Sequence, residues 1–161
     1  MLITQVNSDD LNEIQSMAQV IWNHHYPEII GQEQVDYMLN RMYDLGSLRK
    51  QLADGHIFYK LVKSSENMGF ISIVEQEKGW FLNKLYVMPN TQRLGIGKQL
   101  LEYVIQKHGI QELRLQVNRQ NFKAINFYFK NKFEIERVAD FDIGDGYQMN
   151  DFIMIWKKSA Q

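Results

Sequence analysis

The sequence contains no cysteine and no long apolar run. Without cysteine, the protein can have no disulfides, thiolate nucleophiles or cysteine-ligated metal sites. No apolar stretch approaches the roughly 18 residues that cross a bilayer. The first residues also lack the charged and apolar segments of a signal peptide. These absences predict a soluble protein of the cytoplasm.

The chain also has almost no net charge, because 18 Lys and Arg stand against 19 Asp and Glu, giving −1 at pH 7. Binding to nucleic acid or to a membrane surface would need a basic face, so neither partner is expected. The spacing of histidines and acidic residues suggests no metal site. A length of 161 residues, of which 45% are hydrophobic, is typical of one globular domain covering residues 1–161.

The hydrophobic pattern predicts an α/β (α+β) fold. The expected helices cover residues 11–21, 32–43, 47–53, 97–108 and 122–130, and the expected strands cover residues 2–6, 57–61, 69–75, 80–87, 113–117, 133–141 and 148–157. Ser8 is the expected N-cap of the first helix, and Pro27 is expected to end or redirect it. The strands over 80–87 and 113–117, with the helix between them, predict a βαβ unit with a right-handed crossover.

Two glycines open the helix in that unit, within the run Gln92-Arg93-Leu94-Gly95-Ile96-Gly97-Lys98. Free backbone N–H groups and the helix dipole make such a start an anion site. Glycine lets a pyrophosphate approach the backbone, and Arg93 and Lys98 could add charged contacts. On this pattern alone, a helix start without a ligand is the more frequent explanation. The run lacks the Gly-Lys-Ser/Thr of a Walker loop and the third glycine of a dinucleotide fingerprint.

This run resembles the signature of the GNAT N-acetyltransferase family, Gln/Arg-x-x-Gly-x-Gly/Ala, at every fixed position. The preceding Leu85-Tyr86-Val87-Met88-Pro89 is similar to the family's strand and its exit. The resemblance implies that acetyl-CoA is the acetyl donor. It also implies that Leu85 and Val87 offer backbone groups to the pantetheine arm, and that Gln92 to Lys98 hold the pyrophosphate.

A second motif of the same family is similar to the segment from Val117 to Tyr128. Asn121 is the expected N-cap of its helix, and the resemblance implies that Asn121 also contacts the CoA arm. Tyr128 matches a tyrosine near the cofactor sulfur, which implies that it gives a proton to the leaving thiolate. The alternative is a core tyrosine with a satisfied hydroxyl.

One position departs from the family pattern. The residue before the aromatic Phe133 is usually glycine, but here it is Lys132. We therefore expect Asn131 to adopt the left-handed conformation that ends the helix.

The resemblance covers Leu85 to Phe133 and implies the GNAT fold: a central mixed, mostly antiparallel sheet of about seven strands with helices on both faces. It implies direct transfer of an acetyl group to a primary amine in a ternary complex, with the N–H of Val87 polarising the carbonyl. The general base is not evident, because residues 80–83 lack the carboxylate that some members carry. A water chain or a carboxylate from another segment is expected instead; His24 and His25 are more often structural.

The two ends of the chain loosely resemble a bacterial branch that includes polyamine acetyltransferases of the PaiA type. In this fold the acceptor cleft lies between the first two helices and the last hairpin. The candidate acceptor contacts there are Trp22, Tyr26, Glu28, Tyr147 and Asp151. Aromatic and acidic groups would suit a cationic amine. The alternative is that the aromatics belong to the core and the acids are solvated.

Three functions stay open at this point. The first is acetylation of a small amine, such as a polyamine. The second is acetylation of a protein or peptide, which would favour a wide groove. The third is a non-catalytic acyl-CoA-binding regulatory module. A homodimer is an expectation from the family alone.

Overall fold

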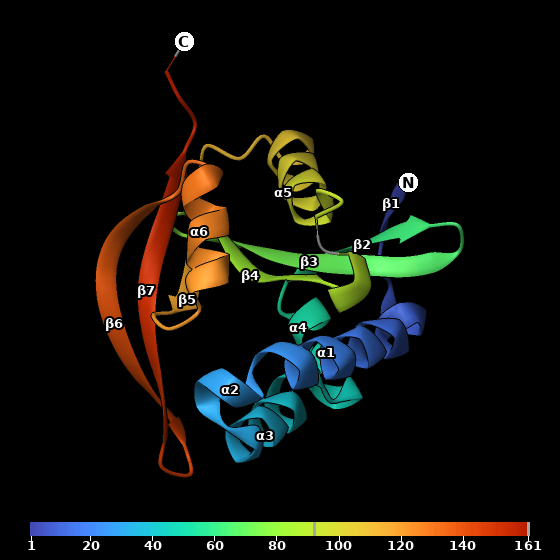
Figure 1. The fold of residues 1–161 in the computed structure, drawn as a ribbon. Helices are drawn as coiled ribbons and strands as arrows, with labels where there is room; N and C mark the ends of the chain where they lie inside the picture. The colour runs from blue at the N-terminus through green and yellow to red at the C-terminus, as the bar shows by residue number, and fades with distance from the viewer. Residues whose placement is uncertain (92, 161) are drawn as a thin grey trace.

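The computed structural model describes residues 1–91 and 93–160, which form a seven-stranded sheet with helices on both faces (Figure 1). The strands are β1 (Leu2–Gln5), β2 (Ile57–Lys63), β3 (Glu66–Gln76), β4 (Gly79–Val87), β5 (Glu112–Asn118), β6 (Glu134–Gly144) and β7 (Tyr147–Lys157). The helices are α1 (Leu11–His25), α2 (Pro27–Ile30), α3 (Gln32–Tyr43), α4 (Leu45–Ala53), α5 (Ile96–Lys107) and α6 (Phe122–Lys130), with short 3-10 turns η1 (Ser8–Asp10) and η2 (Pro89–Thr91).

The sheet order is β1-β2-β3-β4-β5-β7-β6. The pair β4 and β5 is parallel, and the other neighbouring strands are antiparallel. The predicted fold class is therefore confirmed: a mixed, mostly antiparallel sheet. The parallel pair is the one predicted from the strands over 80–87 and 113–117.

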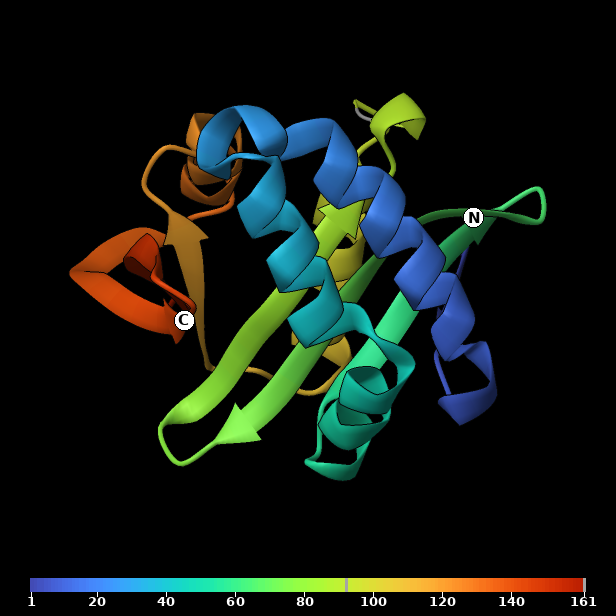
Figure 2. The ribbon, with the colours of Figure 1, turned by 90° about the horizontal axis from the view of Figure 1, so that it is seen from below.

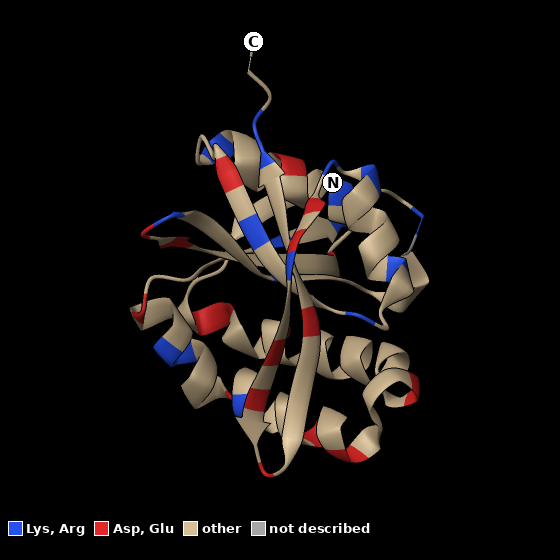
Figure 3. Ribbon diagram, turned by 90° about the vertical axis from the view of Figure 1, so that its left-hand side faces the viewer, with Lys and Arg blue, Asp and Glu red and all other residues tan. Residues whose placement is uncertain are grey.

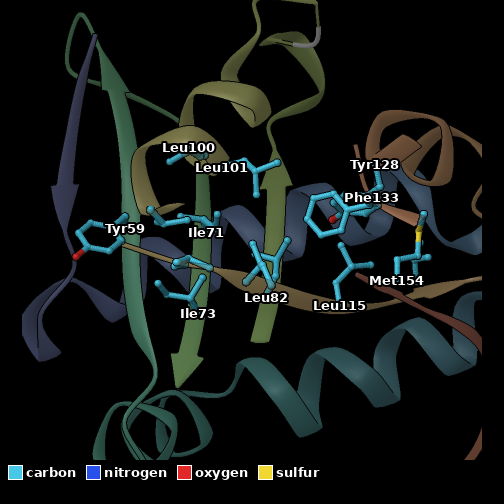
Figure 4. Close-up of a cluster of buried hydrophobic side chains, with 14 of the residues drawn as sticks. Tyr59, Ile71, Ile73, Leu82, Leu100, Leu101, Leu115, Tyr128, Phe133 and Met154 are labelled. Carbon is cyan, nitrogen blue, oxygen red and sulfur yellow. The ribbon is translucent and has the colours of Figure 1, made fainter. Parts of the chain in front are cut away.

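The helices form two layers, with α1 to α4 against one face of the sheet and α5 and α6 against the other (Figures 1 and 2). Each face has its own apolar cluster, because strand residues point alternately to the two faces. Phe58 and Phe70 pack with the layer of α1, α3 and α4, whereas Leu82 packs with α5 and α6. In the second cluster, Tyr128 lies beside Phe133, with ring centroids 5.3 Å apart (Figure 4).

Strands β4 and β5 pair at one end only and then separate. Their parallel register ends at Leu82 and Leu115. The next residue of β4, Asn83, is a β-bulge, because the register with β3 shifts between Ser72 and Ile73 and leaves Asn83 without a paired residue on β3. Beyond this bulge β4 pairs with β3 alone, so the sheet opens between the second half of β4 and β5.

The start of the first helix differs from its prediction. Asn7 caps the 3-10 turn η1, where its Oδ1 accepts a hydrogen bond from the backbone N–H of Asp9 at 2.9 Å. The N-cap of α1 itself is Asp10, whose side chain makes no capping hydrogen bond. The prediction for Ser8 was wrong because a 3-10 turn precedes α1, so the capped turn begins one residue earlier. Pro27 does follow the end of α1, and it occupies the first turn of α2. A missing N–H is tolerated at this position.

The end of α6 also differs from its prediction. Lys132 has the left-handed backbone, with φ 68°, whereas φ of Asn131 is −97°. The prediction for Asn131 was wrong because its side chain bonds within the helix, where Nδ2 donates to the carbonyl of Phe127 at 2.8 Å. The N–H of Phe133 then returns to the carbonyl of Tyr128 at 3.0 Å, which closes the helix.

Candidate active site

The opening in the sheet forms one wall of a cavity of about 830 Å³, between the second half of β4, the start of α5 and α6. Its lining includes most of the donor-site residues predicted from the sequence, which are Leu85, Val87, Arg93, Gly95, Ile96, Gly97, Lys98, Asn121 and Tyr128. Gln92 lies outside the described residues, and Leu94, which is 45% exposed, does not line the cavity. The two motifs therefore surround one space.

The start of α5 presents backbone donors at this cavity. Gly95 has a left-handed backbone, with φ 71°, and caps the helix without a side-chain hydrogen bond. The N–H groups of Gly97 and Lys98 have no acceptor among the described residues. The Lys98 side chain is exposed and lies 3.6 Å from Glu102. Free N–H groups and the helix dipole both favour an anion here, so the loop fits a phosphate group.

Gly97 is required by close packing between three elements. A Cβ built on this residue would lie 3.3 Å from Cζ of Phe127 in α6 and 3.6 Å from Cγ2 of Val87 in β4. The first distance is tighter than an ordinary van der Waals contact. A side chain at this position would therefore occupy space between the helix start and the strand end.

The backbone of β4 beyond the bulge has an open edge. Met88 N–H donates to the Met68 carbonyl at 2.9 Å, so Met88 faces β3. Successive strand residues direct their N–H groups to opposite sides, and Val87 and Leu85 therefore direct theirs away from β3. Among the described strands, none pairs with β4 on that side beyond Leu82. A ligand with amide groups, such as a pantetheine arm, fits this edge because it can form the backbone hydrogen bonds that a neighbouring strand would form.

Helix α6 brings Asn121 and Tyr128 to the cavity. The Oδ1 of Asn121 accepts a backbone N–H of the first turn at 3.3 Å, which confirms its prediction as N-cap. Tyr128 is 8% exposed, and its ring packs edge-on against Phe127 and Phe133. Its hydroxyl has no hydrogen-bond partner within the described chain, and burial raises its pKa. Tyr128 thus combines a buried ring with a hydroxyl that makes no hydrogen bond within the described residues, and its role as proton donor stays a prediction.

A second cavity, of about 90 Å³, adjoins the first. Six residues line both: Tyr26, Leu85, Tyr86, Asn121, Ala124 and Tyr128. The smaller cavity adds walls from α1, β5 and β7, including Trp22, Met149 and Asp151. The two spaces thus meet beside Tyr26 and Tyr128.

Aromatic rings form much of the smaller cavity. Trp22 and Tyr26 stack with centroids 4.3 Å apart, and Tyr26 meets Tyr86 edge-on at 6.5 Å. The hydroxyl of Tyr26 lies 3.4 Å from Nδ2 of Asn121. Burial raises the pKa of Tyr26 and of Tyr86, so both phenols stay neutral. Aromatic faces of this kind attract cations.

Two buried ionisable groups also line the smaller cavity. Asp151 on β7 is 2% exposed, and its Oδ1 has no hydrogen-bond partner in the part of the chain described. Burial raises the pKa of Asp151 to about 6. Lys84 on β4 is equally buried, and its Nζ donates to Oε1 of Gln51 at 2.7 Å and lies 5.2 Å from the Tyr43 ring centre. Burial lowers the pKa of Lys84 to about 7.

The structure brings together three of the five predicted acceptor residues. Trp22, Tyr26 and Asp151 all line the smaller cavity, whereas Glu28 and Tyr147 line neither cavity. Glu28 is exposed on α2, and the ring of Tyr147 packs against a tyrosine of α3. Their part in binding an acceptor stays a prediction.

Sequence analysis did not single out Tyr86, Lys84 or Met149, which also line the smaller cavity. For Lys84 a signal was present. The pair Asn83-Lys84 interrupts an otherwise apolar strand, and polar residues within an apolar run depart from the usual core pattern. For Tyr86 and Met149 the apolar pattern gave no reason to prefer a site over the core.

Acidic side chains gather on the β6–β7 hairpin, toward its turn (Figure 3). Asp140 and Asp142 lie on β6, and Asp145 lies in the turn. Asp140 accepts a hydrogen bond from Arg119 at 2.8 Å. Asp151 lies on β7 opposite Ala139, next to this acidic tract.

Two features are absent from residues 1–91 and 93–160. No group of three or more His, Asp or Glu side chains could hold a metal ion. None of the helices combines the length and hydropathy needed to cross a bilayer.

Comparisons with known proteins agree with this geometry. The model of the acetyltransferase (GNAT) family matches residues 14–133, most of the chain. A spermidine N(1)-acetyltransferase of Thermoplasma acidophilum is 29% identical over 160 residues, covering 94% of each protein. The crystal structure of PaiA N-acetyltransferase from Thermoplasma acidophilum in complex with coenzyme A superposes with a TM-score of 0.79 at 28% identity, covering 98% of this chain and 100% of that one.

A further relative has a different acceptor. The peptidyl-lysine N-acetyltransferase YiaC of Escherichia coli is 42% identical over 89 residues, covering 55% of this chain and 56% of the relative. These relatives share the acetyl-transfer reaction, and the larger cavity of this chain is lined by the start of α5, where backbone N–H groups without an acceptor among the described residues suit a phosphate. The chain belongs to the GNAT acetyltransferase family and is an acetyl-CoA-dependent N-acetyltransferase.

Proposed function

We propose that this enzyme acetylates a primary amine of a small polycation of the polyamine class. The observation that carries the proposal is the smaller cavity, which has aromatic walls and a buried carboxylate and meets the donor cavity beside Tyr128. An alkylammonium group suits such a space, because aromatic faces and a carboxylate both attract a cation. The Thermoplasma relative named for spermidine supports the same class of acceptor.

In this proposal the larger cavity holds the donor. The N–H groups of Gly97 and Lys98, with the side chain of Arg93, bind the pyrophosphate. The open edge at Leu85 and Val87 pairs with the pantetheine arm. Contacts from Gln92, Leu94, Ile96 and Asn121 stay predictions.

Two groups of this chain act on the thioester in the proposed reaction. The N–H of Val87 donates to the carbonyl oxygen, which stabilises negative charge as the amine attacks. Tyr128 gives its phenolic proton to the leaving sulfur. Both residues line the donor cavity, and Tyr128 also lines the acceptor side.

A lysine side chain of a protein is the second candidate acceptor. Lysine ends in the same unbranched primary amine as a polyamine, so a narrow cavity of about 90 Å³ admits either end group. The likeness to the peptidyl-lysine acetyltransferase of Escherichia coli favours this candidate, although it covers 55% of this chain.

A thiol-release assay separates the two candidates. Wild-type enzyme is mixed with acetyl-CoA and, in turn, spermidine, spermine, diamines, amino acids, an aminoglycoside and a lysine peptide. We expect release with polyamines at a kcat/KM at least 10-fold above that with the peptide. A preference for the peptide would replace the proposed acceptor class, and no release with any amine would contradict the proposed function.

Enlarging Gly97 is expected to weaken donor binding. Gly97→Val places branched carbons where a Cβ would already lie 3.3 Å from Phe127. We expect KM for acetyl-CoA to rise about 10-fold or more, equivalent to about 1.4 kcal/mol, with a smaller change in KM for the amine. Gln106→Val, on the exposed side of the same helix, is the matched control. An unchanged KM for acetyl-CoA in Gly97→Val would show that this cavity does not hold the donor.

We further propose that the enzyme works in the cytoplasm, a reducing compartment with which a chain without cysteine is compatible. The homodimer expected from the family stays a prediction, which light scattering of the purified protein tests.

A further inference from the structure

We infer that Asp151 is the proton acceptor of the reaction, taking a proton from the nitrogen of the amine as it attacks the thioester. This inference rests on the proposed function, because it assigns the base that the acceptor site needs. Residues 80–83 of β4 carry no carboxylate. This part of β4 therefore supplies no base, which leaves a carboxylate from another element that faces the acceptor cavity, or a water chain.

Asp151 meets the geometric requirements for this role. It lies on β7 opposite Asn118 of β5, at the edge where β5 has separated from β4. Met149, two residues earlier on the same face of β7, packs against the α1–α3 side of the sheet. Both residues line the smaller cavity, together with Tyr26 and Tyr128. The carboxylate thus faces the space beside the reacting groups.

The carboxylate is also available. Its Oδ1 is buried and accepts no hydrogen bond within the described residues. A buried carboxylate oxygen without a donor costs free energy, and a bound ammonium or amine would supply the missing donor. The unpaired oxygen therefore points to a ligand with an N–H group.

The charged and titratable groups around Asp151 come from five parts of the chain. Arg119, after β5, lowers its pKa and Asp140, on β6, raises it, but desolvation has the larger effect. Arg119 and Asp140 pair with each other near the surface at 2.8 Å. Tyr26 interacts electrostatically with Asp151, and Lys84 and Tyr128 line the same cavity. The net result raises the pKa of Asp151 to about 6, so the group is ionised at neutral pH yet basic enough to accept a proton.

Lys84 is the strongest competing base, and its surroundings argue against it. Its Nζ already donates to Gln51 and lies over the rings of Tyr43 and Phe58, at 5.2 and 5.8 Å from their centres. These contacts direct the amine toward α4. A positive charge on Lys84 would also oppose a cationic acceptor.

The proton balance closes without another reactant. An acceptor that binds as an ammonium first releases one proton to solvent. The neutral nitrogen then forms a C–N bond with the acetyl carbon and loses one proton to Asp151, while the C–S bond breaks. The sulfur takes the phenolic proton of Tyr128. The phenolate then recovers a proton from Asp151, directly or through water, which restores both side chains. The amine and thioester have become an amide and a thiol.

The test compares Asp151→Asn with Asp140→Asn across pH 5 to 9. Asp140→Asn makes the same charge change on a side chain that is 61% exposed and lies outside both cavities. We expect Asp151→Asn to lower kcat about 100-fold at pH 7, with KM for acetyl-CoA unchanged. We also expect it to abolish the rise of kcat/KM with pH near 6. Lys84→Met should retain this rise, and Asp140→Asn should retain it with the midpoint moved to lower pH, because Asp140 raises the pKa of Asp151.

Other outcomes are equally decisive. A rise only in KM for the amine, with kcat and the pH profile retained, would make Asp151 a binding residue and overturn its assignment as base. Loss of the pH-dependent rise in Lys84→Met alone would transfer the role to Lys84. If wild-type enzyme acetylates no amine, the proposed function fails, whereas an active wild type with an equally active Asp151→Asn overturns only this inference.

A readout that does not need turnover is the carboxyl carbon shift of Asp151, followed by NMR against pH in the wild-type protein. The signal is assigned through the backbone resonances of Asp151 in the wild-type protein. We expect a midpoint near 6, above the ordinary aspartate range. A midpoint in the ordinary range would contradict a base poised for proton transfer, and this measurement stands even if the variant fails to fold.

Discussion

Replacing Tyr128 by phenylalanine is expected to lower kcat about 100-fold or more, with little change in KM for acetyl-CoA. A positioned general acid typically contributes 10²–10⁴-fold to a rate. Without the hydroxyl, the sulfur leaves as an unprotonated thiolate. The ring itself stays, and its edge-on contacts with Phe127 and Phe133, each at 5.3 Å, are retained. The fold and the donor site should therefore survive the change.

The matched control for this substitution is Tyr103→Phe. Tyr103 on α5 also packs edge-on against a tyrosine, Tyr59, at 5.2 Å, but it lines neither cavity. The assay is thiol release at saturating acetyl-CoA and polyamine, with thermal unfolding measured in parallel. If Tyr128→Phe keeps its kcat while both variants are folded, Tyr128 is not the proton donor. A rise in KM for acetyl-CoA alone would assign it to donor binding.

Replacing Asp151 by asparagine is expected to stabilise the folded protein at neutral pH. The pKa of Asp151 is raised from 3.8 to about 6 in the folded state, because burial disfavours its charge. Below pH 3.8 the carboxyl is protonated in both states and carries no such penalty. As the pH rises from 3.8 to about 6, the unfolded state gains from ionisation that the folded state resists, so wild type loses stability over this range and the loss is complete above pH 6. A shift of about 2 pKa units corresponds to about 3 kcal/mol as an upper limit.

The measurement is urea unfolding of wild type and Asp151→Asn at pH 4, 5, 6 and 7. We expect the free energy of unfolding of Asp151→Asn, minus that of wild type, to increase by about 2–3 kcal/mol between pH 4 and pH 7. Using the change with pH removes any constant effect of the asparagine side chain itself. Asp140→Asn should show little change, because exposed ion pairs contribute weakly. A difference for Asp151→Asn that is flat with pH would show that its charge is well solvated.

Loss of activity and gain of stability in the same variant would together distinguish a functional residue from a structural one. A carboxylate that merely supports the fold lowers stability when it is removed. A carboxylate held in an unfavourable setting for its chemistry does the opposite. The activity and the stability of Asp151→Asn therefore both test whether the buried charge of Asp151 destabilises the fold and serves the reaction.

The sequence by itself determined the features that depend on neighbours a few positions away. Asn121 caps α6 because its side chain meets the first turn of the same helix. The alternation of apolar residues is local in the same way and predicted each of the strands. The two glycines predicted the start of α5. Local prediction failed for Ser8, because a 3-10 turn precedes α1, and for Asn131, because Lys132 takes the left-handed backbone at the end of α6.

Only the tertiary structure decided which side chains share the acceptor cavity. Asp151 lies beside Tyr26 and Lys84 because β7 pairs with β5, and β5 separates from β4 after Leu82. Glu28 is of the same chemical class as Asp151 and comes from a predicted acceptor segment, yet it is exposed on α2. The physical reason is that strand register and helix packing join residues that are far apart in the chain, and these contacts decide whether a carboxyl is buried and its pKa raised. The sequence pattern shows only which residues of a strand alternate between apolar and polar.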